Sequence, residues 1–366
     1  MLAPALPSFQ HQPHARPVAA DERSALITDP GFGRVFTDHM AVVRYSTAQG
    51  WHDPVITARA PLTIDPACAV LHYAQEIFEG LKAYKLADGG HALFRPDANA
   101  RRFQSSARRL AMPELPEALF VRSLEELVVA DLAWMPPSPE GALYLRPFMI
   151  ASETFLGVKP AAEYLYMVIA SAAGAYWKGG TRPVSLWVAH DYTRAGPGGT
   201  GAAKCGGNYA TSLVAQAEAI RRGCDQVVFL DVAERRWVEE LGGMNIFFVH
   251  ADGSLQTPPL TGTILPGITR DSLIQIARDE GVIVREEPYA IDQWREDAAS
   301  GKLAEAFACG TAAVVTPIGR VAGPDYGFTI GNGGTGPITA RLLQRLNAIQ
   351  RGQALDPHGW RHKLNG

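Results

Sequence analysis

A single lysine in a glycine-rich stretch is the residue of this chain best placed to do chemistry. The stretch reads GPGGTGAAKCGGNY from Gly196 to Tyr209, so Lys204 is surrounded by residues with almost no side chain. Desolvation lowers the pKa of an ammonium group, and the neutral amine can form a Schiff base with an aldehyde. A flat, rigid molecule could lie against such a backbone. The plainer alternative is a flexible connection that carries an incidental lysine.

Two commoner functions of glycine loops do not fit this stretch. Gly196 and Gly201 have the spacing of a P-loop, but Ala202 stands where its lysine must follow. Gly196-x-Gly198-x-x-Gly201 also matches the dinucleotide pattern, yet the predicted helix begins only after Gly207, and arginines occupy the region of the expected acid. Pyridoxal phosphate is the usual aldehyde partner of a reactive lysine. It needs a phosphate cradle, an acid for its pyridine nitrogen and donors for the substrate carboxylate.

Composition indicates an ordinary globular protein with no acidic or basic partner. The chain has 366 residues, which is enough for two domains, with 47% hydrophobic and 19% charged residues and a net charge of −3. Its four cysteines form no CxxC pair, so neither a disulfide framework nor a metal site is expected. The longest apolar run, Tyr164–Trp177, is too short to cross a bilayer. The first twenty residues lack the apolar core of a signal peptide, so we expect a cytoplasmic protein.

Hydrophobic periodicity predicts alternating strands and helices. Strands are expected over Gly33–Arg44, Trp51–Thr63, Leu81–Lys85, Gly141–Met149, Tyr164–Tyr176, Pro183–His190, Gln226–Leu230, Ile246–His250 and Val314–Pro317. Helices are expected over Leu71–Gly80, from the N-cap Asp97 to Leu110, and over Glu117–Trp134, Tyr209–Arg222, Arg270–Glu280 and Pro337–Gln350. The last fifteen residues are expected to be irregular.

The elements around Lys204 offer candidates for the three needs of the cofactor. Tyr144 and Arg146 alternate onto one face of their strand and could bind a carboxylate, although a surface ladder is the plainer interpretation. Glu239 and Glu240 should point to opposite faces if the strand persists, so one of them could reach a bound ring; the plainer alternative is an exposed hairpin acid. Amides at the start of the helix near Arg270 form an anion site.

Taken together, these stretches resemble the branched-chain amino acid aminotransferases, which are pyridoxal-phosphate enzymes of fold type IV. The resemblance extends from about Gly31 to Arg351. Its motifs are Phe36-Thr-Asp-His-Met40, Phe78-Glu-Gly80, Phe94-Arg-Pro96, Tyr144-Leu-Arg-Pro147, Lys204-Cys-Gly-Gly-Asn-Tyr209, Glu240-Leu-Gly-Gly-Met-Asn245, Leu265-Pro-Gly-Ile-Thr-Arg270 and Gly310-Thr-Ala-Ala313. Because so many motifs occur in order, the match is far more specific than any one of them.

The resemblance implies a role for each candidate. Lys204 would bind pyridoxal 5′-phosphate as a Schiff base and then act as general base and acid. Glu240, rather than Glu239, would keep the pyridine nitrogen protonated. The other implied cofactor residues are Tyr209 beside O3′, and Arg102, Ile268, Thr269 and Thr311 at the phosphate.

The substrate residues are also implied by the resemblance. Phe32, Tyr73, Phe78, Tyr144, Arg146 and Tyr176 match positions that line the pocket, and the backbone of Ala312 and Ala313 would receive the substrate carboxylate. The substrates would be leucine, isoleucine or valine and 2-oxoglutarate. A redox CxxC of some animal members is replaced here by Thr316-Pro-Ile-Gly319, so thiol control is not expected.

The fold that the resemblance implies is a two-domain α/β (α+β) structure, with a small N-terminal domain and a larger, β-barrel-like C-terminal domain. The expected boundaries are a flexible arm over 1–30, the small domain over 31–176, a linker over 177–188 and the large domain over 189–366. The family forms homodimers. The open alternatives are a D-amino acid aminotransferase or aminodeoxychorismate lyase within the same fold, a nicotinamide dehydrogenase, and a non-catalytic binding module.

Overall fold

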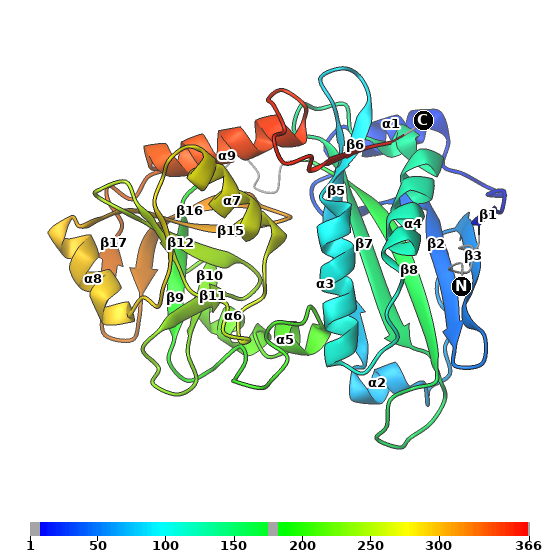
Figure 1. Ribbon diagram of the computed structural model, residues 1–366, viewed down its shortest axis with the longest axis horizontal. Helices are drawn as coiled ribbons and strands as arrows, with labels where there is room; N and C mark the ends of the chain where they lie inside the picture. The colour runs from blue at the N-terminus through cyan, green and yellow to red at the C-terminus, as the bar shows by residue number, and fades with distance from the viewer. Residues whose placement is uncertain (1–7, 175–181, 365–366) are drawn as a thin grey trace. The chain divides into compact units, whose positions relative to one another are not determined.

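The computed structural model describes residues 8–174 and 182–364, which form two compact units (Figure 1). The first unit contains the chain before residue 175 together with Ala203–Gly206 and the chain from Gln350 onward. The second unit contains the remaining residues. This division differs from the single domain expected over 189–366. It differs because the segment around Lys204 and the C-terminal strand both hydrogen-bond to the first unit.

The first unit is built on a mainly antiparallel sheet in the order β1-β3-β2-β8-β7-β5-β6-β18, with β4 also paired to β7. Its strands are β1 (Gln10–His11), β2 (Val35–Ser46), β3 (Gly50–Ala58), β4 (Glu76–Phe78), β5 (Leu81–Lys85), β6 (His91–Phe94), β7 (Ala142–Ala151), β8 (Glu163–Ala173) and β18 (Arg361–Lys363). Alternation along β8 places Tyr166 on the helix-covered face and Leu165 and Met167 on the other.

Two amphipathic helices cover one face of this sheet (Figure 1). They are α3 (Pro96–Arg109) and α4 (Glu117–Ala130), and their apolar sides bury Phe103 and Phe120 against Tyr166. The Tyr166 hydroxyl is satisfied by Ser123 Oγ of α4 at 2.9 Å, so this large ring is buried without an orphaned polar atom. The remaining short helices of the unit are α1 (Ala20–Leu26), α2 (Ala69–Tyr73) and the 3₁₀ turn η1 (Leu132–Trp134).

The second unit has a mixed sheet in the order β11-β10-β9-β16-β15-β12-β13-β14, with β17 paired to β16. Its strands are β9 (Val184–Ala189), β10 (Gln226–Leu230), β11 (Val238–Leu241), β12 (Asn245–His250), β13 (Leu255–Thr257), β14 (Val284–Glu286), β15 (Leu303–Gly310), β16 (Val314–Ala322) and β17 (Gly327–Thr329). Its helices are α5 (Gly206–Ala210), α6 (Leu213–Arg221), α7 (Ile268–Asp279), α8 (Ile291–Ser300) and α9 (Pro337–Gln350), the first residue of α5 belonging to the first unit. The α/β (α+β) class that the resemblance implies is confirmed.

The helix predicted over Leu71–Gly80 is wrong in its second half. The helix α2 stops at Tyr73 because Ala74 adopts a left-handed conformation, with φ of 49°. The chain then continues as β4, whose residues pair with β7. The β-branched Ile77 and aromatic Phe78 suit that strand.

Other predicted boundaries also differ from the structure. The expected helix over Tyr209–Arg222 is two helices, because Thr211 and Ser212 turn their hydroxyls back onto the Asn208 carbonyl. Asp97 lies in the first turn of α3, after the N-cap Arg95. The N-terminal arm, expected to be flexible, forms β1 and α1 from residue 10 onward, and the expected irregular tail forms β18.

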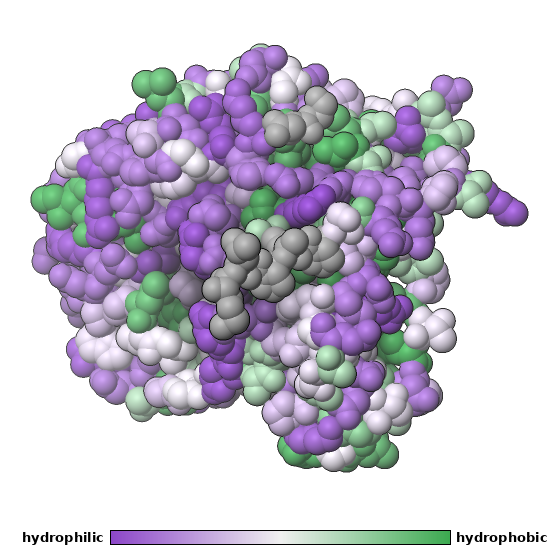
Figure 2. Space-filling view, turned by 45° about the vertical axis from the view of Figure 1, so that its right-hand side comes forward, coloured by the Kyte–Doolittle hydropathy of each residue, from purple (hydrophilic) through white to green (hydrophobic). Residues whose placement is uncertain are grey.

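No helix among residues 8–174 and 182–364 has the length and apolar character needed to cross a bilayer. Figure 2 shows a largely hydrophilic face on which apolar residues form small, separate patches. Residues 177–181 of the linker expected over 177–188 lie outside the described part of the chain, as does Tyr176, and most of the remainder belongs to β9.

Candidate active site

The backbone around Lys204 is fixed to the first unit by three hydrogen bonds. The Lys204 N–H donates to Ser106 Oγ of α3 at 2.9 Å, and the Lys204 carbonyl accepts from the Phe78 N–H of β4 at 2.9 Å. Two residues later, the Gly206 N–H donates to the Glu76 carboxylate. A glycine-rich stretch has no side chains with which to fix itself, so its neighbours supply the order.

The Lys204 amine lies among cations and aromatic rings. Its Nζ is 4.8 Å from the centre of the Phe78 ring, and the Arg146 guanidinium is also 4.8 Å from that ring. Burial and, to a smaller extent, the charge of Arg102 lower the pKa of Lys204 to about 8, against the charge of Glu79, which raises it. A lysine with such a pKa carries an appreciable fraction of neutral, nucleophilic amine near neutral pH.

Arg102 forms a buried, bidentate ion pair with Glu79. Its Nε and Nη2 donate to the two carboxylate oxygens at 2.7 and 2.8 Å, and Asn99 Nδ2 donates to the same carboxylate at 2.7 Å. Although burial raises it, the charge and hydrogen bonds of Arg102 hold the pKa of Glu79 below its usual value. Arg102 is therefore an oriented, permanently charged group close enough to shift the pKa of Lys204.

Three further predicted substrate residues gather around the same place. Arg146 Nη2 donates to the Tyr144 hydroxyl at 2.9 Å, which confirms that both side chains lie on one face of β7. The Phe32 ring meets the Tyr144 ring edge to face at 4.9 Å. Gly80 is required here, since a Cβ at that position would collide with the Tyr144 phenol. The first unit thus brings together Lys204, Arg102, Phe32, Phe78, Tyr144 and Arg146.

In the second unit, Glu240 is buried and held from two sides. Arg194 Nη1 lies 2.9 Å from Glu240 Oε1, and the Leu265 N–H donates to the same oxygen at 2.8 Å. Arg194 also donates to the carbonyls of Gly201 and Thr263, so its position is over-determined. The Glu240 carboxylate is therefore held in one position beside a permanently charged guanidinium.

Glu239 is also buried, so the alternative of an exposed hairpin acid is wrong for both glutamates. It accepts a hydrogen bond from Thr263 Oγ1 at 2.5 Å, and burial raises the pKa of its carboxyl. The two neighbours therefore differ in environment. Glu240 is paired with an arginine, whereas Glu239 faces a hydroxyl.

The backbone groups predicted to bind the phosphate lie near the hairpin that β11 and β12 form. Asn245 Nδ2 donates to the Leu265 carbonyl at 3.0 Å, which fixes the chain just before α7. Within the described residues, no side chain caps the N-terminus of α7, where Ile268 and Thr269 present their backbone N–H groups. Such a helix start favours an anion.

The loop between β15 and β16 carries Thr311, Ala312 and Ala313, all half-buried. It ends at Val314, whose φ of 59° is a strained conformation for a β-branched residue. Strain of this kind is common where a loop must present its backbone to a ligand. Gly310 lies against Met244 in the β11–β12 turn, where a Cβ at Gly310 would be 3.3 Å from Met244 Cγ.

Tyr209, on α5, lies beside the same turn. Its ring would be 3.5 Å from a Cβ placed on Gly243. The second unit thus groups Tyr209, Glu240, the start of α7 and the β15–β16 loop around one hairpin.

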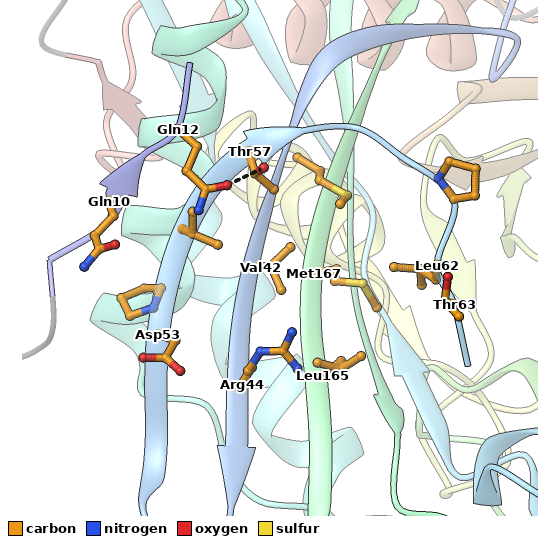
Figure 3. A pocket seen from close by; sticks show the side chains of 14 residues that line it. Gln10, Gln12, Val42, Arg44, Asp53, Thr57, Leu62, Thr63, Leu165 and Met167 are labelled. Carbon is orange, nitrogen blue, oxygen red and sulfur yellow. Dashed lines mark hydrogen bonds between the residues drawn. The ribbon is translucent and has the colours of Figure 1, made fainter. Parts of the chain in front are cut away.

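Tyr73 is not brought to these groups by its contacts with the described part of the chain. It is 36% exposed and stacks on Phe155 with ring centres 6.3 Å apart. A pocket of about 510 Å³ on the uncovered face of β2, β3 and β8 likewise contains none of the predicted site residues (Figure 3). Val42 and Met167 are among its lining residues, and the Thr57 hydroxyl donates to Gln12 beside them (Figure 3).

Sequence reasoning did not assign roles to Glu79, Glu76, Ser106 or Arg194. Glu79 lies within the Phe78-Glu-Gly80 motif, so the motif itself could have pointed to it. Arg194 stands only two residues before Gly196. The sequence pattern there does not show whether an arginine is buried or on the surface. Nothing in the sequence distinguished Glu76 or Ser106.

Comparisons with known proteins identify the family of this chain. The family described as "Amino-transferase class IV" matches residues 76–321. A branched-chain-amino-acid aminotransferase of Mycolicibacterium smegmatis is 54% identical over 98% of both chains, and one of Mycobacterium tuberculosis is 55% identical over 95% of this chain and 96% of its own.

Solved structures extend the agreement to the fold. The branched-chain amino acid aminotransferase from Escherichia coli is 30% identical, covers 90% of this chain and 99% of its own, and superposes with a TM-score of 0.73. A T.th. branched-chain amino acid aminotransferase complexed with N-(5′-phosphopyridoxyl)-L-glutamate is 30% identical, with coverages of 89% and 99% and a TM-score of 0.72. The chain therefore belongs to the class IV aminotransferases and, within them, to the branched-chain-amino-acid aminotransferase family.

Proposed function

We propose that this protein is a pyridoxal-phosphate-dependent branched-chain-amino-acid transaminase. It transfers the amino group of leucine, isoleucine or valine reversibly to 2-oxoglutarate, giving branched-chain 2-oxo acids and glutamate in a ping-pong reaction. The observation that carries this proposal is Lys204, whose pKa is lowered to about 8 beside Arg102, Phe78 and Arg146.

The residues present suit pyridoxal 5′-phosphate. The uncapped start of α7 at Ile268 and Thr269 can bind a phosphate, with the Thr311 hydroxyl on a neighbouring loop and Arg102 as a further cation. Tyr209 is the proposed partner of the ring hydroxyl. The buried Nε of Arg194 and Oε2 of Glu239 have no hydrogen-bond partner among the described residues, as expected where a bound group completes a polar site.

When bound, the cofactor supplies an aldehyde carbon for the amino group and an electron-withdrawing ring. The neutral amine of Lys204 would hold that aldehyde carbon. With a substrate bound, the free Lys204 Nζ would take the proton from the substrate α-carbon and later return one. A pKa of about 8 suits a base that must accept and release a proton near neutral pH. Glu240, held by Arg194, supplies the fixed negative charge at the pyridine nitrogen.

The substrate pocket is proposed to combine apolar walls with a few donors. Phe32, Phe78 and Tyr144 offer apolar surface for a branched side chain, with Tyr73 and Tyr176 as further lining residues. The Arg146–Tyr144 pair can bind the second carboxylate of glutamate, and Arg146 Nε is buried without a hydrogen-bond partner in the described part of the chain. The backbone of Ala312 and Ala313 receives the α-carboxylate.

We further propose a cytoplasmic homodimer in which the first unit, which contains most of residues 31–176, serves as the small domain, and the second unit, which contains most of 189–366, serves as the cofactor domain. The hairpin tip between β7 and β8 supports association, since Leu156 is 68% exposed and Val158 91% exposed. All four cysteines are free and buried, which suits a reducing compartment.

Alternating half-reactions test the function. The purified holoenzyme should be yellow. Its yellow colour, measured as visible absorbance, should be lost on addition of L-leucine and should return on addition of 2-oxoglutarate. D-leucine and D-alanine serve as controls for the D-amino acid alternative. Bleaching by D-alanine but not L-leucine, or no colour change with any amino acid, would refute the proposal.

A further inference from the structure

The hydrogen bond between Glu76 and Gly206 has no role in the mechanism above. Ser106 and Phe78 hold the backbone at Lys204 itself, whereas Glu76 holds the chain two residues later. We propose that Glu76 is a positioning residue, whose carboxylate fixes the Lys204–Gly206 backbone and thereby directs the Lys204 amine. This inference rests on the proposed function of Lys204.

The position of Glu76 on β4 suits this role. Glu76 and Phe78 are two residues apart on a strand, so their side chains leave the same face. On that face, the Phe78 ring lies 4.8 Å from Lys204 Nζ, and the Glu76 carboxylate meets the Gly206 N–H. One short strand therefore contacts both the side chain and the backbone of the lysine segment. Pairing of Glu76 and Phe78 with Ile150 and Phe148 of β7 makes that strand a rigid base.

The close approach at Gly206 shows that the contact is built into the sequence. A Cβ at residue 206 would collide with the Glu76 carboxylate, so glycine is needed for the carboxylate to reach the backbone. Burial raises the pKa of Glu76, against the opposing effects of the Gly206 N–H and the charge of Arg146. A half-buried carboxylate thus carries a desolvation cost at this place, which its bond to Gly206 offsets only in part.

The Glu76–Gly206 hydrogen bond can also affect the position of the Lys204 amine through the intervening backbone. Gly206 and Gly207 begin α5 directly after the buried Cys205 and have no side chains of their own. Without Glu76, the Gly206 N–H at the start of α5 loses its acceptor, so the backbone between Cys205 and Gly207 can rotate more freely. Small misplacements of a catalytic group reduce turnover more than binding.

Hydrogen exchange and kinetics of the holoenzyme test the proposal together. In Glu76→Ala, the Gly206 amide should exchange about tenfold faster, as expected for loss of a hydrogen bond worth roughly 1.4 kcal/mol. The kcat for L-leucine should fall about tenfold while its KM changes less than about twofold. Glu76→Gln keeps a neutral acceptor, so its Gly206 exchange rate and its kcat should both be close to the wild-type values. If the alanine variant does not fold, the glutamine variant is measured on its own.

Asp65→Asn is the matched control, because Asp65 also accepts a backbone N–H, from Ala67 at 2.8 Å, away from the lysine segment. It should change neither readout. Unchanged Gly206 exchange in Glu76→Ala would overturn the proposal, as would faster exchange with an unaltered kcat. If the wild-type enzyme showed no transamination at all, the proposed function would fail, while the exchange data would still report on the Glu76 bond.

Discussion

At the scale of single residues, a lowered lysine pKa does not by itself identify the reactive amine. Lys82, on β5, is buried too, and burial together with the charge of Arg351 lowers its pKa to about 8. What separates the two lysines is their surroundings, since Lys204 lies on the Phe78 ring in a backbone free of bulky side chains.

The lowered pKa predicts how Schiff-base formation depends on pH once the cofactor has been removed. As the pH rises through about 8, Lys204 loses its proton and becomes nucleophilic. The rate at which the apoprotein binds added pyridoxal 5′-phosphate covalently should therefore rise up to about pH 8 and level off above it, as followed by absorbance. A rate that keeps climbing toward pH 10 would show an ordinary lysine, whose amine is only about 0.03% neutral at pH 7.

Glu240 and Glu239 provide a matched pair of substitutions on β11. Glu240→Gln removes the negative charge that Arg194 and the Leu265 N–H hold in place, so the half-reaction with L-leucine should slow by at least about a hundredfold. Glu239→Gln keeps an acceptor for the Thr263 hydroxyl and should cost less than about threefold. Single-turnover absorbance measures both rates, and a larger loss in Glu239→Gln would reverse the assignment.

At the scale of elements, α3 carries two ion pairs of different character in adjacent residues. The Arg102–Glu79 pair is almost fully buried, whereas Arg101 and Asp97 are each more than half exposed. Removing one partner of a buried pair leaves an uncompensated charge, so Glu79→Ala should lower the free energy of unfolding by about 3–5 kcal/mol. Asp97→Ala should lower it by less than about 0.5 kcal/mol. Equal losses in urea unfolding would contradict the structural role given to Glu79.

Some elements could be predicted from the sequence, and others could not. The helices α3, α4 and α9 have long amphipathic or well-bounded patterns, and they were found within a few residues of their ends. The strand β4 was missed because its three residues follow helix-like spacing, and only pairing with β7 makes them a strand. The break between α5 and α6 was missed because it depends on hydroxyls folding back onto Asn208.

The site was predicted where a residue type alone implies chemistry, and missed where tertiary contacts create it. Lys204 stands out in any reading of the glycine-rich stretch, and family motifs marked Glu240 and Arg102. The pairing of Arg102 with Glu79 joins β4–β5 to α3, and that of Arg194 with Glu240 joins a loop to β11. Such contacts link distant segments, so spacing along the chain does not indicate them. The phosphate contact of Arg102 stays a prediction.

At the scale of the whole molecule, the exposed hairpin tip predicts the proposed dimer interface. Val158→Asp places a charge at a position that is 91% exposed in the single chain. Burying that charge in an interface should make the free energy of association less favourable by roughly 2–4 kcal/mol. Sedimentation at micromolar protein should then show monomer. Val129→Asp, at an α4 residue that is 44% exposed, is the control and should leave the wild-type mass unchanged. A wild-type mass for Val158→Asp would exclude this tip from the interface.

The covalent partner of the cofactor tests the central claim most directly. Borohydride reduction of the holoenzyme fixes the cofactor to its lysine, and mass spectrometry of the peptides then locates the label. We predict one pyridoxyl group on Lys204 and none on Lys82, even though the pKa of each is lowered to about 8. Lys204→Ala should carry no label and show no turnover, because both imine formation and proton transfer depend on that amine. A label on Lys82, or turnover surviving in Lys204→Ala, would contradict the account.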